Sequence, residues 1–264
     1  MPNETSKKLS LVDIPELPES VDNALKNITD EPTKNMGHTF GDVWFLVFGG
    51  ISQAAEKKRL KYAHDLEIYH RELEEKIDQI PEEHYEDPSI QVTAQALENS
   101  KYCVSEEELR KMFVNLIGNS MDNRTSPFVH PSFPEMIKQM TPIEAQLISS
   151  FKNNKAQPIA NFVVKLPKYQ TRMLENYEFI MDDGSYSFSY KSAISSLERL
   201  GLLSVTFQKH LIDDSLYDKF RNLPYFNHLK QEYGNSSKKH VVDIQKGMCT
   251  LTPLGDFFVR ACVP

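Results

Sequence analysis

Residues 105–148 read SEEELRKMFVNLIGNSMDNRTSPFVHPSFPEMIKQMTPIEAQLI, and this stretch carries the helix signals that decide the fold. Ser105, Ser132 and Thr141 each stand three places before a Glu, which is the spacing of a capping box, where two side chains satisfy free N–H groups at a helix start. Pro142 strengthens the third signal, because proline suits the first helical position. The stretch therefore predicts three successive helices, the first two reversed at a short histidine-proline linker.

The first predicted helix has one apolar face, made by residues at a three-and-four spacing: Leu109, Met112, Phe113, Leu116, Ile117 and Ser120. The opposite face carries the charged residues Glu106, Glu107, Arg110 and Lys111. The third predicted helix repeats the apolar spacing with Ile143, Leu147, Ile148 and Phe151. We expect the apolar faces to meet in a core.

This stretch and the residues before it resemble the abortive infection alpha family of bacterial proteins. An acidic approach at residues 80–88 leads to a small-residue helix ending near Tyr102, and then to the motifs EELRxMFxNLxxNxMD at 107–122 and VHPSFxExIKQMxP at 129–142. The residues that carry the resemblance are Glu108, Leu109, Arg110, Met112, Phe113, Asn115, Leu116, Asn119, Met121, Asp122, His130, Pro131, Ser132, Phe133, Glu135, Ile137 and Pro142. The resemblance implies defence against bacteriophage, in which the infected cell stops before the phage can spread, and it transfers no catalytic residue.

The composition is that of a globular protein with one large or two ordinary domains, since 40% of the 264 residues are hydrophobic. Cys103, Cys249 and Cys262 are far apart and odd in number, which argues against a disulfide framework or a paired-cysteine zinc site. The start has no signal-peptide core, and no run approaches the roughly 20 apolar residues of a membrane-spanning helix. We expect a cytoplasmic protein without a metal or cofactor.

Charge is distributed unevenly along the chain. Residues 1–141 contain 15 Lys and Arg against 25 Asp and Glu, whereas residues 142–264 contain 15 against 12. Only the second part favours a polyanion, and its excess is far below that of a dedicated nucleic-acid binder. The charge pattern therefore supports a nucleic-acid partner only weakly.

We predict a weakly ordered arm at residues 1–35 and a helical region at 36–141. The most hydrophobic stretch, residues 40–51, contains Trp44, Phe45 and Phe48. A long helix is predicted at 52–80, with an apolar stripe made by Tyr62, Leu66, Tyr69, Leu73, Ile77 and Ile80.

Both features allow a functional and a structural interpretation. The aromatic residues at 44–48 suit a membrane interface, but Asp42 lies in the stretch and no basic cluster precedes it, so we favour burial in the core or in an oligomer. The stripe can be a dimerisation or docking surface, but packing against the Leu109–Ile117 face of the same chain is the more frequent outcome. We expect no membrane partner.

Residues 142–264 have a different pattern. A strand is predicted at 159–166, a helix at 190–203 that stops at Gly201, and a strand beginning at 205–207. Strands at 241–244 and 248–251 flank a predicted turn at Gly247, and Thr252 with Pro253 begins a last helix. The aromatic-rich insertion at 211–239 is expected to pack onto this region.

This order of elements resembles a winged-helix domain, with SxLERLGLL at 195–203 in the place of the recognition helix. Base reading needs exposed Arg, Lys, Asn or Gln on that helix, and residues 190–203 offer few. The candidate nucleic-acid contacts are mainly phosphate contacts, from Lys191, Arg199, Lys238, Lys239 and Lys246.

Enzyme signatures are absent from the sequence: it has no GxSxG, P-loop, GxGxxG or HExxH pattern. His70 and Glu74 share a helical face but supply only two metal ligands, and we expect His130 to order its linker through backbone carbonyls. Asn115, Asn119 and Asp122 are expected to supply buried polar contacts to the same turn.

We therefore predict a mainly α protein of the α+β type, in which an N-terminal helical region precedes a winged-helix-like domain. Its expected function is anti-phage defence by binding a phage or host protein, without catalysis and as a homo-oligomer. A DNA-binding transcriptional regulator is the first alternative, and a membrane-active toxic effector is the second.

Overall fold

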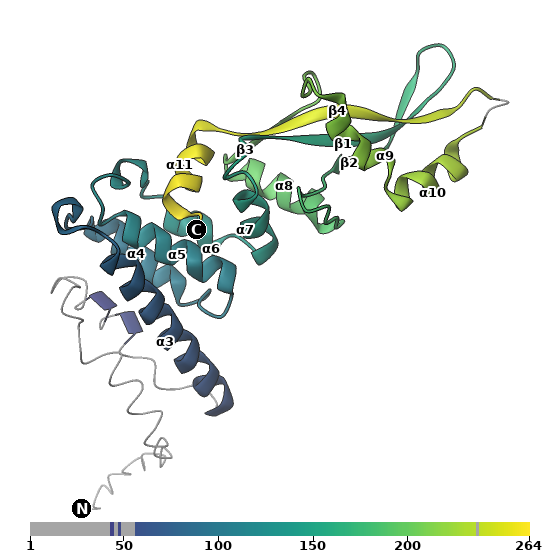
Figure 1. Ribbon diagram of the computed structural model, residues 1–264. Coiled ribbons are helices and arrows are strands. Elements are labelled where there is room, and N and C mark those ends of the chain that lie inside the picture. Colours follow the sequence, from purple (N-terminus) through teal and green to yellow (C-terminus); the bar gives the residue numbers. More distant parts are fainter. Residues whose placement is uncertain (1–42, 45–46, 49–55, 236–237) are drawn as a thin grey trace, which may run out of the picture.

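The computed structural model describes residues 43–44, 47–48, 56–235 and 238–264 (Figure 1). The predicted arm at residues 1–35 lies outside this part of the chain. The described residues form a helical body and a four-stranded antiparallel sheet that extends away from it (Figure 1). The fold is therefore mixed α and β, and the winged-helix assignment is not confirmed.

The α-helices of the described part are α3 (Glu56–Asp78), α4 (Ile90–Ser100), α5 (Glu107–Asn119), α6 (Phe133–Lys138), α7 (Pro142–Ser149), α8 (Ser189–Arg199), α9 (Asp218–Arg221), α10 (Pro224–Tyr233) and α11 (Pro253–Cys262). The three helices predicted from residues 105–148 are α5, α6 and α7. The long helix predicted to end at residue 80 ends at Asp78.

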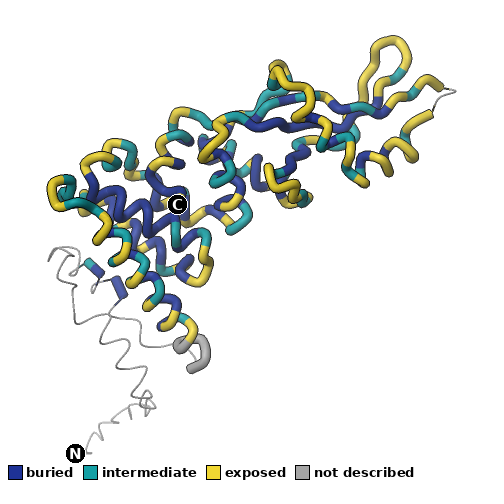
Figure 2. Tube along the Cα trace, in the orientation of Figure 1, coloured by how far each residue is buried: buried dark blue, intermediate teal, exposed yellow. Residues whose placement is uncertain are grey.

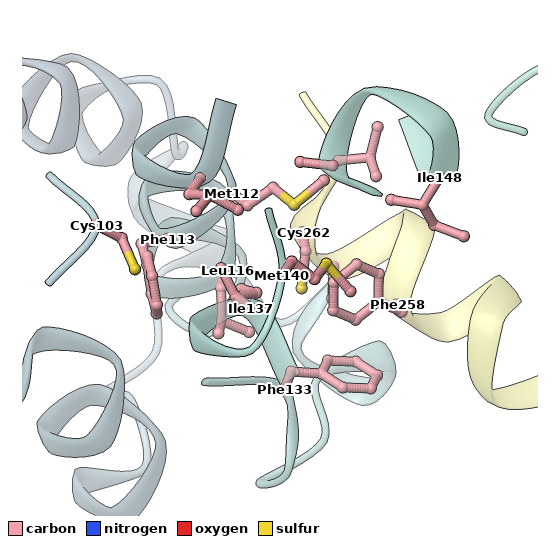
Figure 3. Packing of buried hydrophobic residues seen from close by; sticks show 14 of the residues in the cluster. Cys103, Met112, Phe113, Leu116, Phe133, Ile137, Met140, Ile148, Phe258 and Cys262 are labelled. Carbon is pink, nitrogen blue, oxygen red and sulfur yellow. The ribbon is translucent and has the colours of Figure 1, made fainter. Parts of the chain in front are cut away.

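The centre of the helical body is α5, whose predicted apolar face is buried. Phe113, Leu116 and Ile117 are fully buried, and Figure 3 shows Phe113 and Leu116 among side chains from neighbouring segments. Helix α11 returns to this core late in the chain, where Phe258 meets Phe133 edge-on with ring centroids 5.1 Å apart. The larger core thus contains residues from both the region predicted at 36–141 and the region predicted at 142–264.

Only one of the three predicted capping boxes forms, and it is the one at Thr141. The Thr141 hydroxyl accepts from the Glu144 N–H at 3.4 Å, and the Glu144 carboxylate accepts from the Thr141 N–H at 2.5 Å. At α5 the prediction was wrong, because Glu106 is the N-cap and the Glu108 carboxylate instead accepts from the Gln146 side chain.

The capping box predicted at Ser132 is also absent. Ser132 has helical backbone angles, and its hydroxyl lies 2.8 Å from Nδ1 of His130. The Glu135 carboxylate accepts from the Asn99 side chain. A neighbour in the linker has therefore taken the serine, and a residue distant in the chain has taken the glutamate.

The sheet has the order β2-β1-β4-β3, with β1 at Ala156–Lys165, β2 at Thr171–Glu178, β3 at Leu203–Thr206 and β4 at Val241–Leu251. The turn predicted at Gly247 is wrong, because β4 runs through it as one strand. Gly247 pairs with Ile159, and a Cβ there would lie 2.6 Å from the Phe207 ring. This glycine permits a close approach and does not make a turn.

Strand β2 was not predicted. It lies at the edge of the sheet, between β1 and α8 in the chain, and most of its residues are exposed or half-buried. The helix predicted at 190–203 ends earlier, at Arg199, and the strand predicted from 205 begins at Leu203. Gly201 lies between them with a φ of +75°, as expected of a residue that stops a helix.

The insertion at 211–239 packs onto the sheet, as predicted. Tyr217, Phe220 and Phe226 are buried with Phe162 of β1 and Ile244 of β4 in a second core. Figure 2 shows buried positions along the middle of the sheet and exposed ones at its far end.

The apolar stripe of α3 packs inside its own chain. Leu66, Tyr69 and Leu73 are almost fully buried, so the intramolecular interpretation is confirmed for them. Trp44 and Phe48 are also buried, with ring centroids 5.6 and 6.4 Å from that of Tyr69. Phe45 lies outside the described residues. Among the helices that the structure describes, none is long and apolar enough to cross a membrane.

Candidate functional site

A pocket of about 500 Å³ lies where α3, α5 and α11 meet the segment that follows α7. Its floor includes Asn115 and Asn119, which are one turn apart on α5 and belong to the family motif. Both side chains are buried to about nine-tenths. The sequence analysis named these two residues. In the structure they lie beside basic residues that the sequence analysis did not name.

Asn119 joins α5 to the end of α11. Its Nδ2 donates to the carbonyl oxygens of Ala261 at 2.9 Å and Arg260 at 3.4 Å. Asn115 donates to the Lys111 carbonyl within its own helix. The expectation that these amides contact the His130 turn was wrong, because the Asn119 amide donates to α11 and the Asn115 amide to its own helix.

Lys76 of α3 crosses over α5 at Gly118. A Cβ at Gly118 would lie 2.4 Å from Cγ of Lys76, so the absence of a side chain there allows the lysine stem to pass. Burial lowers the pKa of Lys76, Asp122 opposes this effect and Lys152 adds to it. Within the described part of the chain, the Lys76 ammonium has no ion-pair partner.

Three more cations line the pocket. Asp256 forms ion pairs with Lys155 and, at 3.1 Å, with Arg260, and these contacts hold its pKa below the usual range. Lys152 instead donates to the Pro264 backbone oxygen at 2.5 Å. Among the pocket's cations, Lys76 is the one for which the described part of the chain shows no hydrogen bond or ion pair, although Asp122 is close enough to favour its charged form.

The rest of the wall is apolar, formed by Phe151, Leu251, Val259 and Val263. A pocket with an apolar wall and a few polar groups has the usual form of a small-molecule site. Groups of three or more metal-ligating side chains do not occur in the described part of the chain.

Arg110 was placed wrongly on the solvent face. Its side chain is mostly buried, and Nε and Nη2 donate to the two carboxylate oxygens of Glu72 at 2.9 and 3.1 Å. Nη1 donates to the Val104 carbonyl at 3.0 Å. Arg110 thus joins α3 to α5 as a structural residue.

The remaining motif residues are mainly structural. Leu109, Met112, Phe113, Leu116, Met121, Phe133 and Ile137 belong to the core, and Pro142 stands at the first position of α7. Asp122 accepts from Arg124. His130 and Pro131 are exposed, and Nδ1 of His130 accepts from the Ser132 N–H at 3.2 Å, not from backbone carbonyls as expected.

The candidate nucleic-acid contacts do not form one surface patch of free cations. Lys191 lies between Glu175 and Glu178, at 2.7 and 2.6 Å. Lys246 pairs with Asp214 at 2.6 Å, and Arg199 donates to Gln139. Lys238 and Lys239 are exposed beside the start of β4.

The Lys191 cluster joins α8 to β2 and the insertion. Tyr186 donates to Glu178 and Tyr225 donates to Glu175, so each carboxylate has a tyrosine partner besides the lysine. Burial raises the pKa of Glu175, but Lys191 and Tyr225 more than offset this effect, and the pKa lies below its ordinary value of 4.5.

Replacing Lys191 with Met is expected to destabilise the protein by about 2 kcal/mol near neutral pH, because Glu178 stays fully buried without its cation. The lowered pKa of Glu175 contributes stability above about pH 4.5 that is lost as the pH falls. The difference between wild type and variant should therefore shrink below that pH. Urea unfolding at pH 4 and pH 7 measures both, and an equal difference at the two pH values would contradict the assignment.

The described residues thus form a mixed α and β fold with a basic pocket, and this fold can be compared with known families. The family model for abortive infection alpha matches residues 61–262, so this chain belongs to that family. Membership suggests a role in abortive infection. No curated protein and no solved structure matched the chain.

Proposed function

We propose that this protein acts in abortive infection by binding a component of the infected cell, from the phage or the host, and not by catalysis. The observation that carries the proposal is the family match, which extends from α3 to the end of α11 and so includes every element around the pocket. A preformed pocket with polar groups on one side is the usual form of a binding site.

The two alternatives receive less support from the described residues. DNA reading would use Lys191 and Lys246, whose ammonium groups are already paired with carboxylates. Membrane activity would use Trp44 and Phe48, which are almost completely buried. Freeing any of these side chains would cost the contacts that they make now.

The proposal is tested with phage on bacteria that carry the gene or an empty vector. Protected cells are expected to form fewer plaques, to release fewer phage in a single growth cycle and, at high phage-to-cell ratio, to stop growing. The control is the gene with a stop codon at Glu56. Equal plaque numbers and equal burst sizes, with the folded protein detected in the cells, would refute the proposed role for each phage tested.

A further inference from the structure

We propose that the free end of the sheet binds a single-stranded nucleic acid through its phosphates and the faces of its unpaired bases. This surface, called here the sheet tip, consists of the turn between β1 and β2 at residues 166–170 and of Lys238 and Lys239 before β4. The inference rests on the proposed function, in which the protein binds a component of the infected cell, and it adds the chemistry of that component. It differs from the DNA-reading alternative, because contacts to phosphates and base faces read no base sequence.

The register of the sheet brings the two parts of the sheet tip to one end. Lys165 of β1 pairs with Thr171 of β2 on one side and with Val241 of β4 on the other. The turn after Lys165 and the residues just before Val241 therefore leave the sheet at the same end, which points away from the helical body (Figure 1). Residues 56–141, which form most of that body, contain 17 Asp and Glu against 11 Lys and Arg. A polyanion can thus reach the sheet tip without approaching the acidic part of the protein.

Positive charge at the sheet tip is left without a carboxylate partner. Neither residues 165–172 nor residues 234–242 contain an Asp or Glu. Lys165 is paired with Asp243 of β4 at 2.5 Å. Three further lysines are exposed, and their ammonium groups have no ion pair or hydrogen bond with any residue that the structure describes: Lys168, Lys238 and Lys239. Unpaired cations on one projecting surface are what a phosphate backbone requires.

The turn between β1 and β2 presents a lysine and a tyrosine in a conformation that side chains rarely adopt. Lys168 and Tyr169 have φ of +63° and +61°, in the left-handed region that suits glycine and asparagine. Tyr169 is fully exposed, so packing of its ring does not offset this cost in stability. An aromatic ring held in solvent beside a lysine can stack on a base while the lysine contacts the adjacent phosphate.

The composition of the sheet tip favours a nucleic acid over an anionic membrane. Tyr169 is the large hydrophobic residue that the turn exposes, between Lys168 and Gln170, and Val241 is exposed at the start of β4. Membrane binding depends on the apolar area that enters the lipid, and one tyrosine with one valine supplies little. A single ring among cations and an amide is instead the usual composition of a surface that binds single strands.

The inference is tested on the purified full-length protein by fluorescence anisotropy at low salt. The probes are labelled oligo-U RNA and oligo-dT DNA of about 20 nucleotides, which exceeds the length of such a site, and a DNA duplex of the same length. We expect both single strands to bind more tightly than the duplex. The logarithm of their affinity should fall with the logarithm of the salt concentration with a slope of about −2, the value for three phosphate contacts on a single strand.

Two kinds of substitution separate the charged contacts from the stacking contact. Lys168→Met, and the double variant Lys238→Met with Lys239→Met, should weaken binding and make the salt slope shallower by about 0.7 for each lysine removed. Tyr169→Ala should weaken binding by about tenfold and leave the slope unchanged, whereas Tyr169→Phe should bind as wild type does. All four positions are exposed, so the variants should fold, as circular dichroism can verify.

The matched controls are Lys61→Met and Tyr102→Ala, which remove an exposed lysine and an exposed tyrosine from the helical body. Both should bind the single strands as wild type does. Absence of single-strand binding at low salt, or an equal loss in the control and sheet-tip variants, would overturn the inference. So would duplex binding as tight as single-strand binding, or binding to vesicles of phosphatidylcholine and phosphatidylserine without binding to either strand.

The two proposals fail in different experiments. Phage protection by a wild-type protein that binds neither single strand would leave the defence role standing and remove the nucleic-acid surface. Single-strand binding through the sheet tip without any phage protection would do the reverse.

Discussion

Phe113→Ala is expected to destabilise the protein by about 3 to 5 kcal/mol, the largest effect among the single substitutions considered. Phe113 is fully buried at the middle of α5, and Figure 3 shows Cys103 beside it. Removing the ring leaves a cavity that the packed helices cannot close without losing their own contacts. Chemical unfolding followed by circular dichroism measures the change as a lower midpoint with an unchanged slope.

The matched control is Phe257→Ala on α11. Phe257 is 42% exposed, and its ring meets that of Phe128 edge-on with centroids 5.4 Å apart, so the expected loss is about 1 kcal/mol. A Phe113 variant as stable as the Phe257 variant would show that α5 does not occupy the centre of the core.

Arg110→Met is expected to cost about 3 kcal/mol, the second largest effect. The substitution keeps an aliphatic stem but removes three hydrogen bonds, two to Glu72 and one to the Val104 carbonyl. In the variant, the Glu72 carboxylate, whose side chain is only 21% exposed, has no cation beside it. A largely buried charge without a partner destabilises the folded state. Thermal and urea unfolding measure the loss.

The double variant Arg110→Met with Glu72→Met should recover much of that stability, because no unpaired charge remains at the contact. Lys111→Met is the control, since Lys111 is the next residue on α5 and its pairing with Glu107 is exposed to solvent. It should leave the unfolding midpoint almost unchanged. A double variant that is less stable than Arg110→Met alone would contradict this account of the pair.

The sequence predicted the elements that are specified locally and by periodicity. The apolar face of α5, the stripe of α3 and the Thr141 capping box all depend on residues within a few turns of each other, and all three are found. Ser105 and Ser132 carry the same local signal, but residues distant in the chain took their glutamates. A capping-box signal involves only neighbouring residues, so it carries no information about partners that are distant in the chain.

The errors in the sheet have similar causes. Strand β2 is a polar edge strand, so it lacks the apolar alternation that marks a half-buried strand. Gly247 is a residue type typical of turns, but here it lies within a strand, where the close Phe207 ring leaves no room for a side chain. Arg110 has a charge typical of a surface position, and only Glu72, 38 residues earlier, makes its burial favourable.

The pocket could be predicted only in part. Asn115 and Asn119 share a helical face, which the sequence allows one to see. Lys76, Lys152 and Arg260 come from three separated segments, and each looks like an ordinary solvated lysine or arginine in its own segment. Their meeting depends on how α3 crosses α5 and on where α11 ends, and both are properties of the tertiary fold.

The bond from Asn119 to Ala261 also concerns the synthesis of the protein on the ribosome. The two residues are 142 positions apart. When α5 leaves the ribosomal exit tunnel, this contact cannot yet form, because α11 has not been translated. Until then the surface that receives Phe258 is open to water and to chaperones. The family's helical motif can thus reach its native packing only in a chain translated through α11, and premature termination upstream should give a product that is degraded.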